Sequence, residues 1–503
     1  MSFETKSFNV LKKVQLPQSQ VEKDCNVELE GDVNKILSSS SQVSVLDYEV
    51  LDGEISYNAE LQNCVVYLAE ENKIGSSNSV CEFSGKIANS QINLGDKVLL
   101  SLNINENKVK FENGNAIISV VVDENVELIK EKEVKSLDSS DDDVCTKKGN
   151  ITLEKFVGSG KSEGVTEEEI SAKENVKKII SVEPSIIIKS TESDNRSVTV
   201  YGDTITRIIY LTVDDKFESS FVNSSFKEEI EVDNARQGMI AICKAVAKRK
   251  DTSVEILESD KGTKIALKTP FVLNVYVFDS EECEVVEDLF STKNEVKLSS
   301  ESFEMTKVCK TETLEGKIDG SLTLSDDKPR VDKIIFNGGN MISITNAYVS
   351  NKELFVEGIA KTTIVYLNDE ENSLNSVEVE VPFVLSDKVD ARDNAAVCTD
   401  AVLYDTDVSV RRGREIFFDG KVKASVRVCQ DDVSATLVDA EKGEPVEERD
   451  YAMQYVYGKE GESLWDIAKR NKVKEEQITI QNPDAVFPLV KDDGFILFFQ
   501  KTI

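Results

Sequence analysis

Carboxylates are the most abundant reactive side chains of this chain, whereas imidazole is absent. The 503 residues include 93 Asp and Glu, 60 Lys and Arg, and no His. Ser-His-Asp and Cys-His catalysis and most proton transfers near pH 7 depend on imidazole, so the sequence excludes peptidases and amidases of those kinds. Two carboxylates about 5–10 Å apart are enough for a glycosidase. With so many acids present, that pairing has no predictive value, and we expect a protein that is not an enzyme.

Cofactor and metal chemistry finds equally little support in the sequence. Nine cysteines are dispersed without a Cys-x-x-Cys pair, at positions 25, 64, 81, 145, 243, 283, 309, 398 and 429. Their odd number and wide spacing indicate free thiols in a reducing compartment. Without clustered Cys or His ligands we expect no metal site. The glycine-rich run 157–164 lacks the first Gly of a phosphate-binding loop and predicts a flexible loop. We therefore expect no cofactor.

Net charge and hydropathy disfavour several classes of binding partner and a location in the membrane. The net charge of −33 disfavours nucleic acid and anionic lipid, which bind through clustered Lys and Arg. The most apolar run, residues 271–278, is far shorter than the ~18–20 residues that cross a bilayer, so we expect no membrane insertion. Residues 1–14 contain no apolar segment typical of a signal peptide. These features predict a cytosolic protein that is not secreted.

A sequence pattern that occurs three times predicts the strands on which functional side chains would lie. A Val-x-Lys-Ile step is followed by a Tyr-Leu pair 34, 34 and 35 residues later, and by a Phe 16, 16 and 17 residues after that. The members are Val33, Val176 and Val331; Tyr67, Tyr210 and Tyr366; and Phe83, Phe226 and Phe383. Since one inserted residue moves every following strand side chain to the opposite face, equal spacing predicts the same strand, turn and strand three times.

The repeat is typical of antiparallel β-sandwiches. Alternating β-branched residues before Tyr210, such as Val198, Val200 and Ile208, predict one buried strand face. A small residue lies mid-strand in each copy, as Ala59, Gly202 and Gly358. This residue fits a bulge or close backbone approach, and equally a strand that tolerates one Gly. Turn signals include Asn337-Gly338-Gly339 and Asp419-Gly420.

These patterns predict a mainly β protein of three antiparallel β-sandwich-like modules with short flanking helices and a small C-terminal domain. The helix is clearest over residues 167–180, where Ile170, Val176 and Ile179 form an apolar stripe. The predicted ranges are 1–130 for repeat 1, 131–150 for an acidic linker, 151–300 for repeat 2, 301–440 for repeat 3, 441–450 for a hinge, and 451–503 for the C-terminal domain.

The last 53 residues differ from the repeats in pattern and in charge. Residues 451–503 contain 7 Lys and Arg and 8 Asp and Glu, so nearly all the negative charge lies before them. A strand at 455–457 precedes a helix that Ser463 and Asp466 begin as a capping box. A second helix over 474–481 and a strand over 495–499 complete a βααβ arrangement. Trp465, the only Trp, is expected to supply much of this small core.

This segment resembles the LysM domain in the run 461–469, in Asn482-Pro483, and in Leu497. LysM domains typically bind N-acetylglucosamine polymers in a groove between the first strand–helix loop and the second helix–strand loop. The resemblance therefore implies binding residues at Gly461, Glu462, Ser463, Leu464, Trp465, Asn482, Pro483, Asp484, Ala485 and Val486. Glu462 stands where the family usually has Asp. The alternative is that Leu464, Trp465 and Ile467 are core residues.

The three modules and the C-terminal domain together resemble the clostridial spore-coat morphogenetic proteins of the SipL type, with repeated SPOCS domains. The segment 176–182, the Tyr-Leu pair and Phe226 carry the resemblance. It implies a scaffold in the mother-cell cytoplasm, at the forespore surface and spore coat. The implied partners are the coat ATPase named stage IV sporulation protein A and other coat proteins. The alternative is a peptidoglycan-binding protein of the cortex or cell wall.

Overall fold

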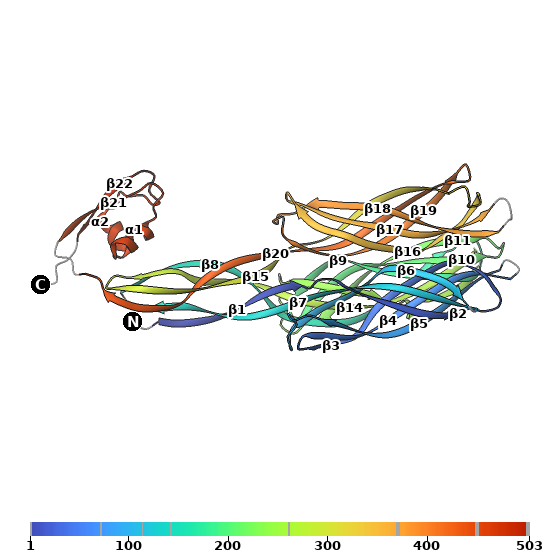
Figure 1. The fold of residues 1–503 in the computed structure, drawn as a ribbon, viewed down its shortest axis with the longest axis horizontal. Coiled ribbons are helices and arrows are strands. Elements are labelled where there is room, and N and C mark those ends of the chain that lie inside the picture. The colour runs from blue at the N-terminus through green and yellow to red at the C-terminus, as the bar shows by residue number, and fades with distance from the viewer. Residues whose placement is uncertain are drawn as a thin grey trace.

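Long antiparallel strands make up almost the whole molecule (Figure 1). The computed structural model describes residues 3–70, 73–112, 114–140, 143–259, 262–368, 373–447 and 452–498. The first module consists of β1 (Phe3–Gln15), β2 (Ser19–Glu28), β3 (Val33–Leu51), β4 (Glu54–Ala69), β5 (Ile74–Ala88), β6 (Lys97–Glu112) and β7 (Asn115–Ser140). The prediction of a mainly β protein is confirmed.

The second and third modules repeat this order of strands. The second consists of β8 (Val144–Ser171), β9 (Val176–Asp194), β10 (Ser197–Thr212), β11 (Phe217–Glu231), β12 (Ile240–Ala247), the short 3-10 helix η2 (Arg249–Asp251), β13 (Ser253–Ser259) and β14 (Gly262–Ser291). The third consists of β15 (Asn294–Thr323), β16 (Val331–Ser350), β17 (Glu353–Asn368), β18 (Leu374–Lys388), β19 (Ala396–Arg411) and β20 (Glu415–Pro445).

Each module packs two antiparallel sheets face to face. One sheet has three strands, in the order β3-β4-β5, β9-β10-β11 or β16-β17-β18. The other pairs the first strand of the module with its last, as in β15-β20-β19. Alternating apolar side chains from both sheets fill the space between them, as Val200, Phe226 and Val275 do in the second module. This is the arrangement expected of a β-sandwich.

The repeat spacing corresponds to cross-strand pairing. Each Tyr lies opposite the Ile of its Val-x-Lys-Ile step: Ile36 pairs with Tyr67, Ile179 with Tyr210 and Ile334 with Tyr366. Each Phe lies opposite the small mid-strand residue: Phe83 pairs with Ala59, Phe226 with Gly202 and Phe383 with Gly358. The prediction of one strand–turn–strand unit built three times is therefore confirmed.

The mid-strand glycines lie where another backbone comes close. A Cβ on Gly202 would lie 2.6 Å from the Ile187 carbonyl oxygen and would also meet the Phe226 ring. Gly358 is in the same position, 2.7 Å from the Ser343 carbonyl oxygen. The neighbouring strand also changes register at this point, between Tyr201 and Gly202. Of the two interpretations left open by the sequence, close approach beside a bulge is the one observed.

Three two-stranded ribbons extend beyond the modules as a stalk, shown toward the chain's N-terminus in Figure 1. They are formed by β1 with β7, by β8 with β14, and by β15 with β20. The N-terminal strand of each module thus pairs with a segment more than a hundred residues later. Apolar side chains from all three ribbons meet inside the stalk, including Val10, Leu153 and Phe303.

The acidic segment 131–150 belongs to this stalk, so the prediction of a linker there is corrected. Strand β7 continues to Ser140 and β8 begins at Val144. Their backbone groups are paired with β1 and with β14 rather than with water. The segment 441–450 is also partly strand, because β20 ends at Pro445, and residues 448–450 lie outside the described residues. Alternating charges are compatible with a strand whose outer face is solvated.

The predicted helix over 167–180 is wrong. Residues up to Ser171 belong to β8, and β9 begins at Val176. The apolar residues that suggested a helical stripe belong to two strands separated by a turn, and Ile170 and Val176 meet in one core cluster. The run 157–164, predicted as a loop, is also strand β8. Gly160 is needed there because a Cβ would lie 2.6 Å from the Glu231 carbonyl oxygen.

Two predicted turns are likewise inside strands. Asn337-Gly338-Gly339 lies in β16, where the register shifts between Gly338 and Met341. Asp419-Gly420 lies in β20, paired with β15 and β19. Glycine next to Asn or Asp marks a bulge as readily as a turn, and local sequence does not separate the two. The prediction of free thiols is confirmed, since all nine cysteines are unbridged.

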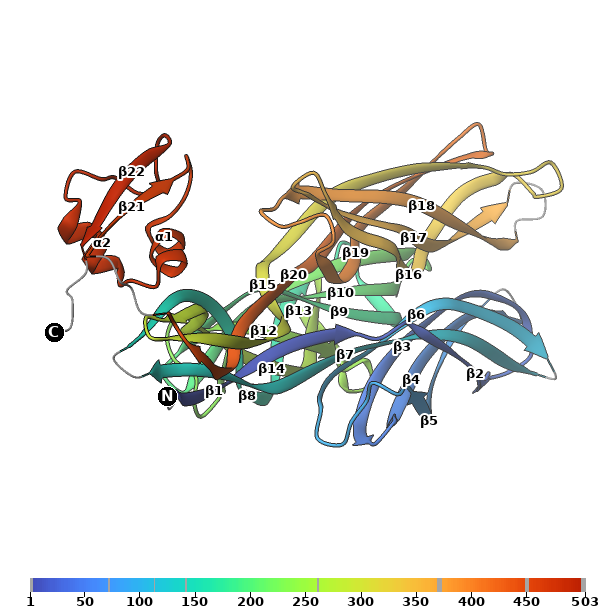
Figure 2. The same cartoon turned by 60° about the vertical axis from the view of Figure 1, so that its left-hand side comes forward.

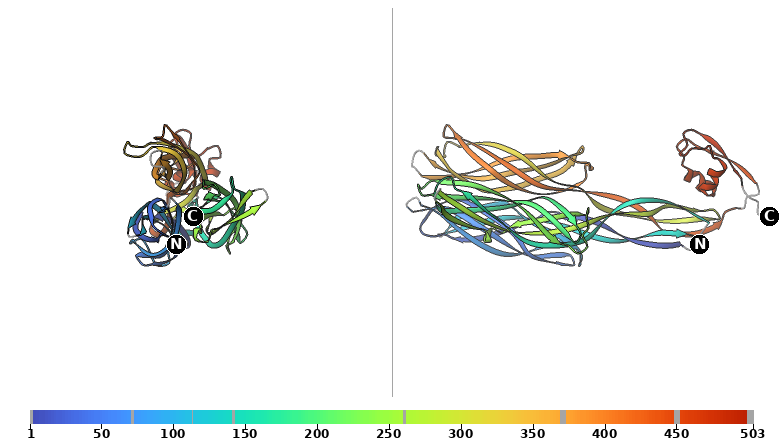
Figure 3. Two further views of the ribbon diagram at one scale, coloured as in Figure 1. Left: turned by 90° about the vertical axis from the view of Figure 1, so that its right-hand side faces the viewer. Right: turned by 180° about the vertical axis from the view of Figure 1, so that it is seen from behind.

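The modules surround a common axis, as the end-on view of Figure 3 shows. The outer faces of the three-stranded sheets meet in a shared apolar cluster that includes Val66, Ile209 and Val365. Strand β10 is consequently buried on both faces, where the sequence predicted one. Buried ion pairs also join the modules, including Lys13 with Glu154 at 2.9 Å and Arg427 with Glu127. Unpaired charges at these depths are costly, so the pairs favour one relative placement.

Candidate functional site

The C-terminal domain has the strand–helix–helix–strand order expected from the sequence. It consists of β21 (Met453–Gly458), α1 (Leu464–Asn471), α2 (Glu475–Gln481) and β22 (Asp493–Phe498). The strands pair in an antiparallel ribbon, with Tyr455 opposite Ile496. Figure 2 shows this domain beyond the end of the stalk, apart from the three modules.

A capping box begins α1, as the sequence predicted. The Ser463 side chain accepts a hydrogen bond from Asp466 N at 3.2 Å, and Ser463 N donates to the Asp466 carboxylate at 3.4 Å. These bonds satisfy amide groups that have no partner within the first turn. The helix ends at Lys472, whose backbone is in the left-handed conformation. Helix α1 therefore begins directly after the first candidate loop.

The two candidate loops lie side by side. Gly461 N donates to the Leu489 carbonyl at 2.8 Å, and Leu489 N donates to the Glu462 carbonyl at 3.1 Å. Gly461 has a φ of +82°, a conformation that glycine adopts without a steric penalty. The Glu462 carboxylate accepts hydrogen bonds from Lys459 N at 3.0 Å and from Arg470. The Glu462 carboxylate is thus already engaged within the domain.

The second loop is more open to solvent. Asn482 ends α2, with its backbone and side-chain amides donating to the Ile478 carbonyl at 2.9 and 3.0 Å. Pro483, Asp484 and Val486 are exposed, and Ala485 is half-buried against the domain core. The exposed residues of the candidate set therefore come mainly from this loop.

Trp465 does not line an open groove. Its side chain is buried within the core cluster of the domain, together with Ile467 and Leu497, and half-buried Leu464 packs against the same cluster. The alternative interpretation, that Leu464, Trp465 and Ile467 are core residues, agrees with these positions. The chain's only indole therefore stabilises the fold of the domain.

Trp465 also joins the domain to the stalk. Its indole N–H donates to the Asp288 carboxylate at 2.8 Å, and Lys469 pairs with the same carboxylate at 2.6 Å. The Phe290 ring packs edge-on against the indole, with centroids 5.1 Å apart. Asp288 and Phe290 lie near the end of β14, more than 170 residues earlier in the chain. Sequence reasoning missed both residues, because no local pattern connects segments so far apart.

The environment of Asp288 stabilises its charged form. Burial acts to raise the pKa of this carboxyl, but hydrogen bonds from Lys469 and Trp465 outweigh burial and lower the pKa below its ordinary value. A second ion pair, Lys472 with Glu295 at 2.9 Å, lies on the same side of the domain. The C-terminal domain is thus held on the stalk by the Asp288 carboxylate and by the apolar packing of Phe290.

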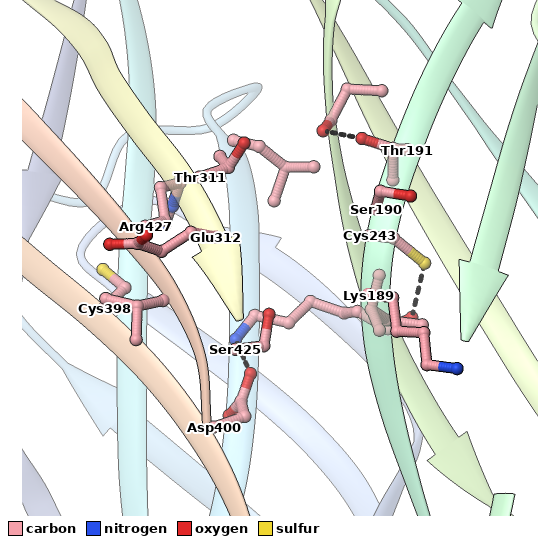
Figure 4. A pocket seen from close by; sticks show the side chains of 15 residues that line it. Lys189, Ser190, Thr191, Cys243, Thr311, Glu312, Cys398, Asp400, Ser425 and Arg427 are labelled. Atoms are coloured by element: carbon pink, nitrogen blue, oxygen red, sulfur yellow. Dashed lines mark hydrogen bonds and ion pairs between the residues drawn. The ribbon is translucent and has the colours of Figure 1, made fainter. Parts of the chain in front are cut away.

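A cavity between the second and third modules was a competing candidate site (Figure 4). Its volume is about 130 Å³, and its lining includes Lys189, Cys243, Lys244, Cys398 and Asp400. Small-molecule sites usually measure roughly 300–1,000 Å³. The Lys244 ammonium pairs with Asp400 at 2.7 Å. Lys189 pairs with Asp203 at 2.5 Å. We interpret this cavity as a packing gap between modules, since its volume is too small and both of its lysines are already paired.

Neither a metal site nor a membrane-spanning helix emerges from the described part of the chain. No three His, Cys, Asp or Glu side chains among the described residues are grouped so that they could hold a metal ion. Helices long and apolar enough to cross a membrane are likewise absent from the described ranges.

The fold defines a class of protein built from repeated β-sandwich modules, and sequence comparison identifies the family. Residues 175–257 and 330–411, which lie in the second and third modules, match the family described as SipL, SPOCS domain. These two modules are therefore SPOCS domains of the SipL family, and this family is associated with sporulation. No curated protein and no solved structure matches the chain.

The first module lies outside the two matched ranges, although it shares their register. Its cross-strand pairs Ile36–Tyr67 and Ala59–Phe83 are equivalent to those of the matched modules. Ala59 replaces the glycine found in the other two copies, and the N-terminal strand is divided into β1 and β2. The structure therefore contains three modules of this kind, of which the first is the most divergent.

Proposed function

We propose that this protein is a non-catalytic scaffold of the spore coat. It recruits or bridges the ATPase of the coat basement layer, stage IV sporulation protein A, together with other coat proteins. In this proposal it acts in the mother-cell cytoplasm, at the forespore surface, and the LysM-like C-terminal domain is its binding module. The family match supports the link to sporulation. The position of the C-terminal domain, apart from the modules, supports its role as the binding module.

The observation that carries the proposal is that a small domain with an exposed loop is held beyond the end of a long stalk. The Trp465–Asp288 contact keeps that domain on the stalk, away from the modules. The modules themselves are joined by buried ion pairs such as Lys13–Glu154. Binding surfaces on such a body keep fixed separations, which strengthens attachment to a polymeric partner because several contacts can form together.

The proposal is tested by deleting residues 451–503. Affinity capture from sporulating cells should recover the ATPase with the full chain and lose it with the truncated chain, and the truncated chain should no longer localise to the forespore. Far-UV circular dichroism should show that the modules keep their β structure, because their cores do not include the C-terminal domain. Unchanged capture and localisation of the truncated chain would refute the proposal.

Peptidoglycan binding is the second candidate function. It is favoured by the backbone bonds that join the two loops, since these place Gly461 and Glu462 beside the exposed second loop. The full chain should then sediment with purified peptidoglycan, and the truncated chain should remain in solution. Sedimentation without any capture of the ATPase would favour this function over the scaffold.

A further inference from the structure

Four of the chain's twelve arginines gather at the end of the third module farthest from the stalk. Arg411, Arg412 and Arg414 lie at the turn between β19 and β20, and Arg330 ends the loop between β15 and β16. Figure 1 shows this turn and the stalk at opposite ends of the molecule. A backbone hydrogen bond of 2.8 Å from Val331 N to the Gly413 carbonyl holds the turn and the loop together.

Three of these guanidinium groups are available to an external ligand. The Arg412 side chain is 87% exposed, with its nearest carboxylate, Glu415, at 3.8 Å. Arg411 lies over the Phe417 ring, and neither Arg330 nor Arg411 forms an ion pair within the described ranges. Arg414 instead donates to the carbonyls of the neighbouring loop and so supports the turn itself. We call Arg330, Arg411 and Arg412 the basic tip.

The basic tip is not required by the repeated fold. In the first and second modules, the sequence between the last two strands, residues 112–115 and 259–262, contains no arginine. The loops equivalent to that of Arg330 carry acids such as Glu30, Asp32 and Glu174 and no arginine, whereas the Arg330 loop combines Asp326 and Asp327 with Lys328 and Arg330. The three modules share their cores without this cluster, so folding does not account for its presence. Guanidinium groups bind carboxylates with two parallel hydrogen bonds, and an acidic polypeptide is therefore a suitable ligand.

The stalk of the same protein presents such a surface. Strand β14 has six acids between residues 279 and 288. Glu284 and Glu287 face Lys148 and Lys147, at 2.7 and 3.8 Å. Glu281 and Glu282 are exposed and form no ion pair within the part of the chain that the structure describes. The chain thus has an arginine cluster at one end and unpaired glutamates on the stalk toward the other.

We infer that the basic tip binds the acidic β14 edge of the stalk of a second copy of this chain. The two surfaces differ and lie toward opposite ends, so each copy can bind one neighbour through its tip and another through its stalk. Contacts of this head-to-tail kind build open chains when the rotation does not close a ring. Such self-association is a property beyond the binding of the ATPase, and it does not require the C-terminal domain to bind anything.

Charge arrangement favours this ligand over an anionic membrane. The other two modules carry acids in their turns at the same end of the molecule, including Glu30, Asp32, Asp214 and Asp215, and a flat anionic surface would repel these turns. A single strand edge can reach the tip alone. The overall charge of −33 is no obstacle at physiological salt, because the Debye length of about 8 Å screens remote charges more strongly than contacts.

Analytical ultracentrifugation of the full chain tests the inference. The native protein should form concentration-dependent oligomers at about 150 mM salt that dissociate near 500 mM. The triple variant Arg330→Glu, Arg411→Glu, Arg412→Glu should associate at least about tenfold more weakly, as should Glu281→Lys, Glu282→Lys. A mixture of the two variants combines the native tip of one with the native stalk edge of the other, and its reversed tip and reversed edge are also of opposite charge, so association should be restored.

The matched control is Lys86→Glu, Lys108→Glu, Lys110→Glu, which changes the net charge equally on the first module, where these lysines are exposed. This control should associate nearly as well as the native chain. The inference is overturned if the native chain remains monomeric at about 150 mM salt, or if the control weakens association as much as the tip variant. Tip-dependent binding of the monomer to phosphatidylglycerol vesicles, without self-association, would also overturn it.

Discussion

The three modules and the C-terminal domain are stabilised by different kinds of contact. Each module repeats the same cross-strand pairs, and the modules bury apolar faces against one another. The C-terminal domain has one small core centred on Trp465 and contacts the stalk through Asp288 and Phe290. Damage to a repeated position can therefore be compared with its two counterparts, whereas the C-terminal domain depends on a few unique side chains.

The largest effect is expected for Trp465→Ala. Removal of a buried Trp costs about 3–5 kcal/mol, comparable to the whole stability of a domain of this size. The C-terminal domain should unfold while the modules remain intact. Limited proteolysis should then remove residues after about 450 from the variant and leave the rest resistant. Tyr455→Ala, at a side chain that is 68% exposed, is the control and should leave the domain resistant.

A smaller effect, still large for one side chain, is expected for Gly202→Val. The added side chain meets the Ile187 carbonyl and the Phe226 ring, and overpacking of this kind costs about 3 kcal/mol. Gly358→Val should cost about the same, because its surroundings are equivalent. Urea unfolding monitored by circular dichroism measures both. A difference of more than about 1.5 kcal/mol between the two variants would contradict the equivalence of the modules.

The repeated tyrosines of the three modules differ in the hydrogen bonds that their hydroxyl groups form. The Tyr67 hydroxyl accepts a hydrogen bond from Glu30 N at 3.1 Å, and the Tyr210 hydroxyl accepts one from Lys173 N at 3.4 Å. The buried Tyr366 hydroxyl has no partner among the described residues. We expect Tyr67→Phe to cost about 1 kcal/mol, whereas Tyr366→Phe should be neutral or stabilising. Equal losses from both substitutions in urea unfolding would disprove the difference.

The smallest effect concerns the contact between the two regions. The pKa of Asp288 is lowered in the folded protein, so its contribution is complete above the unfolded value of about 3.9 and is lost as the pH falls through the lower folded value. Fluorescence of the single Trp465 should report this change on acidification. Asp288→Asn should abolish the transition, and Glu284→Gln, on the same strand, should preserve it. A transition retained by Asp288→Asn would assign it to another group.

Spacing in the sequence was sufficient to predict the cross-strand register of the three-stranded sheets. It was sufficient because one residue of slip would exchange the two faces of a strand, so the equal spacing of the first two copies has one structural explanation. In the third copy β16 is one residue longer than β3 and β9, and register shifts accommodate the extra residue. The capping residues Ser463 and Asp466 predicted the start of α1 for a similar reason, since a cap acts over three residues. The structure shows both the cross-strand register that the spacing predicted and the helix start that the capping residues predicted.

Pairing between distant segments was beyond such reasoning. Residues 131–150 read as an acidic linker because their partners, β1 and β14, are not adjacent to them in the sequence. Residues 167–180 read as a helix because an apolar stripe can arise from two strands separated by a turn. In both cases the decisive contacts were long-range, and propensity alone does not encode them.

The sequence by itself determined that one module is built three times and that a small capped domain follows, because period, spacing and helix caps act between near neighbours. Only the tertiary structure decided that the modules close around one axis, that paired strand ends form a stalk, and that Asp288 holds Trp465. These outcomes depend on which surfaces remain to be buried after each sheet has formed. Burial is shared between segments far apart in the chain, so it is settled only when the whole chain has folded.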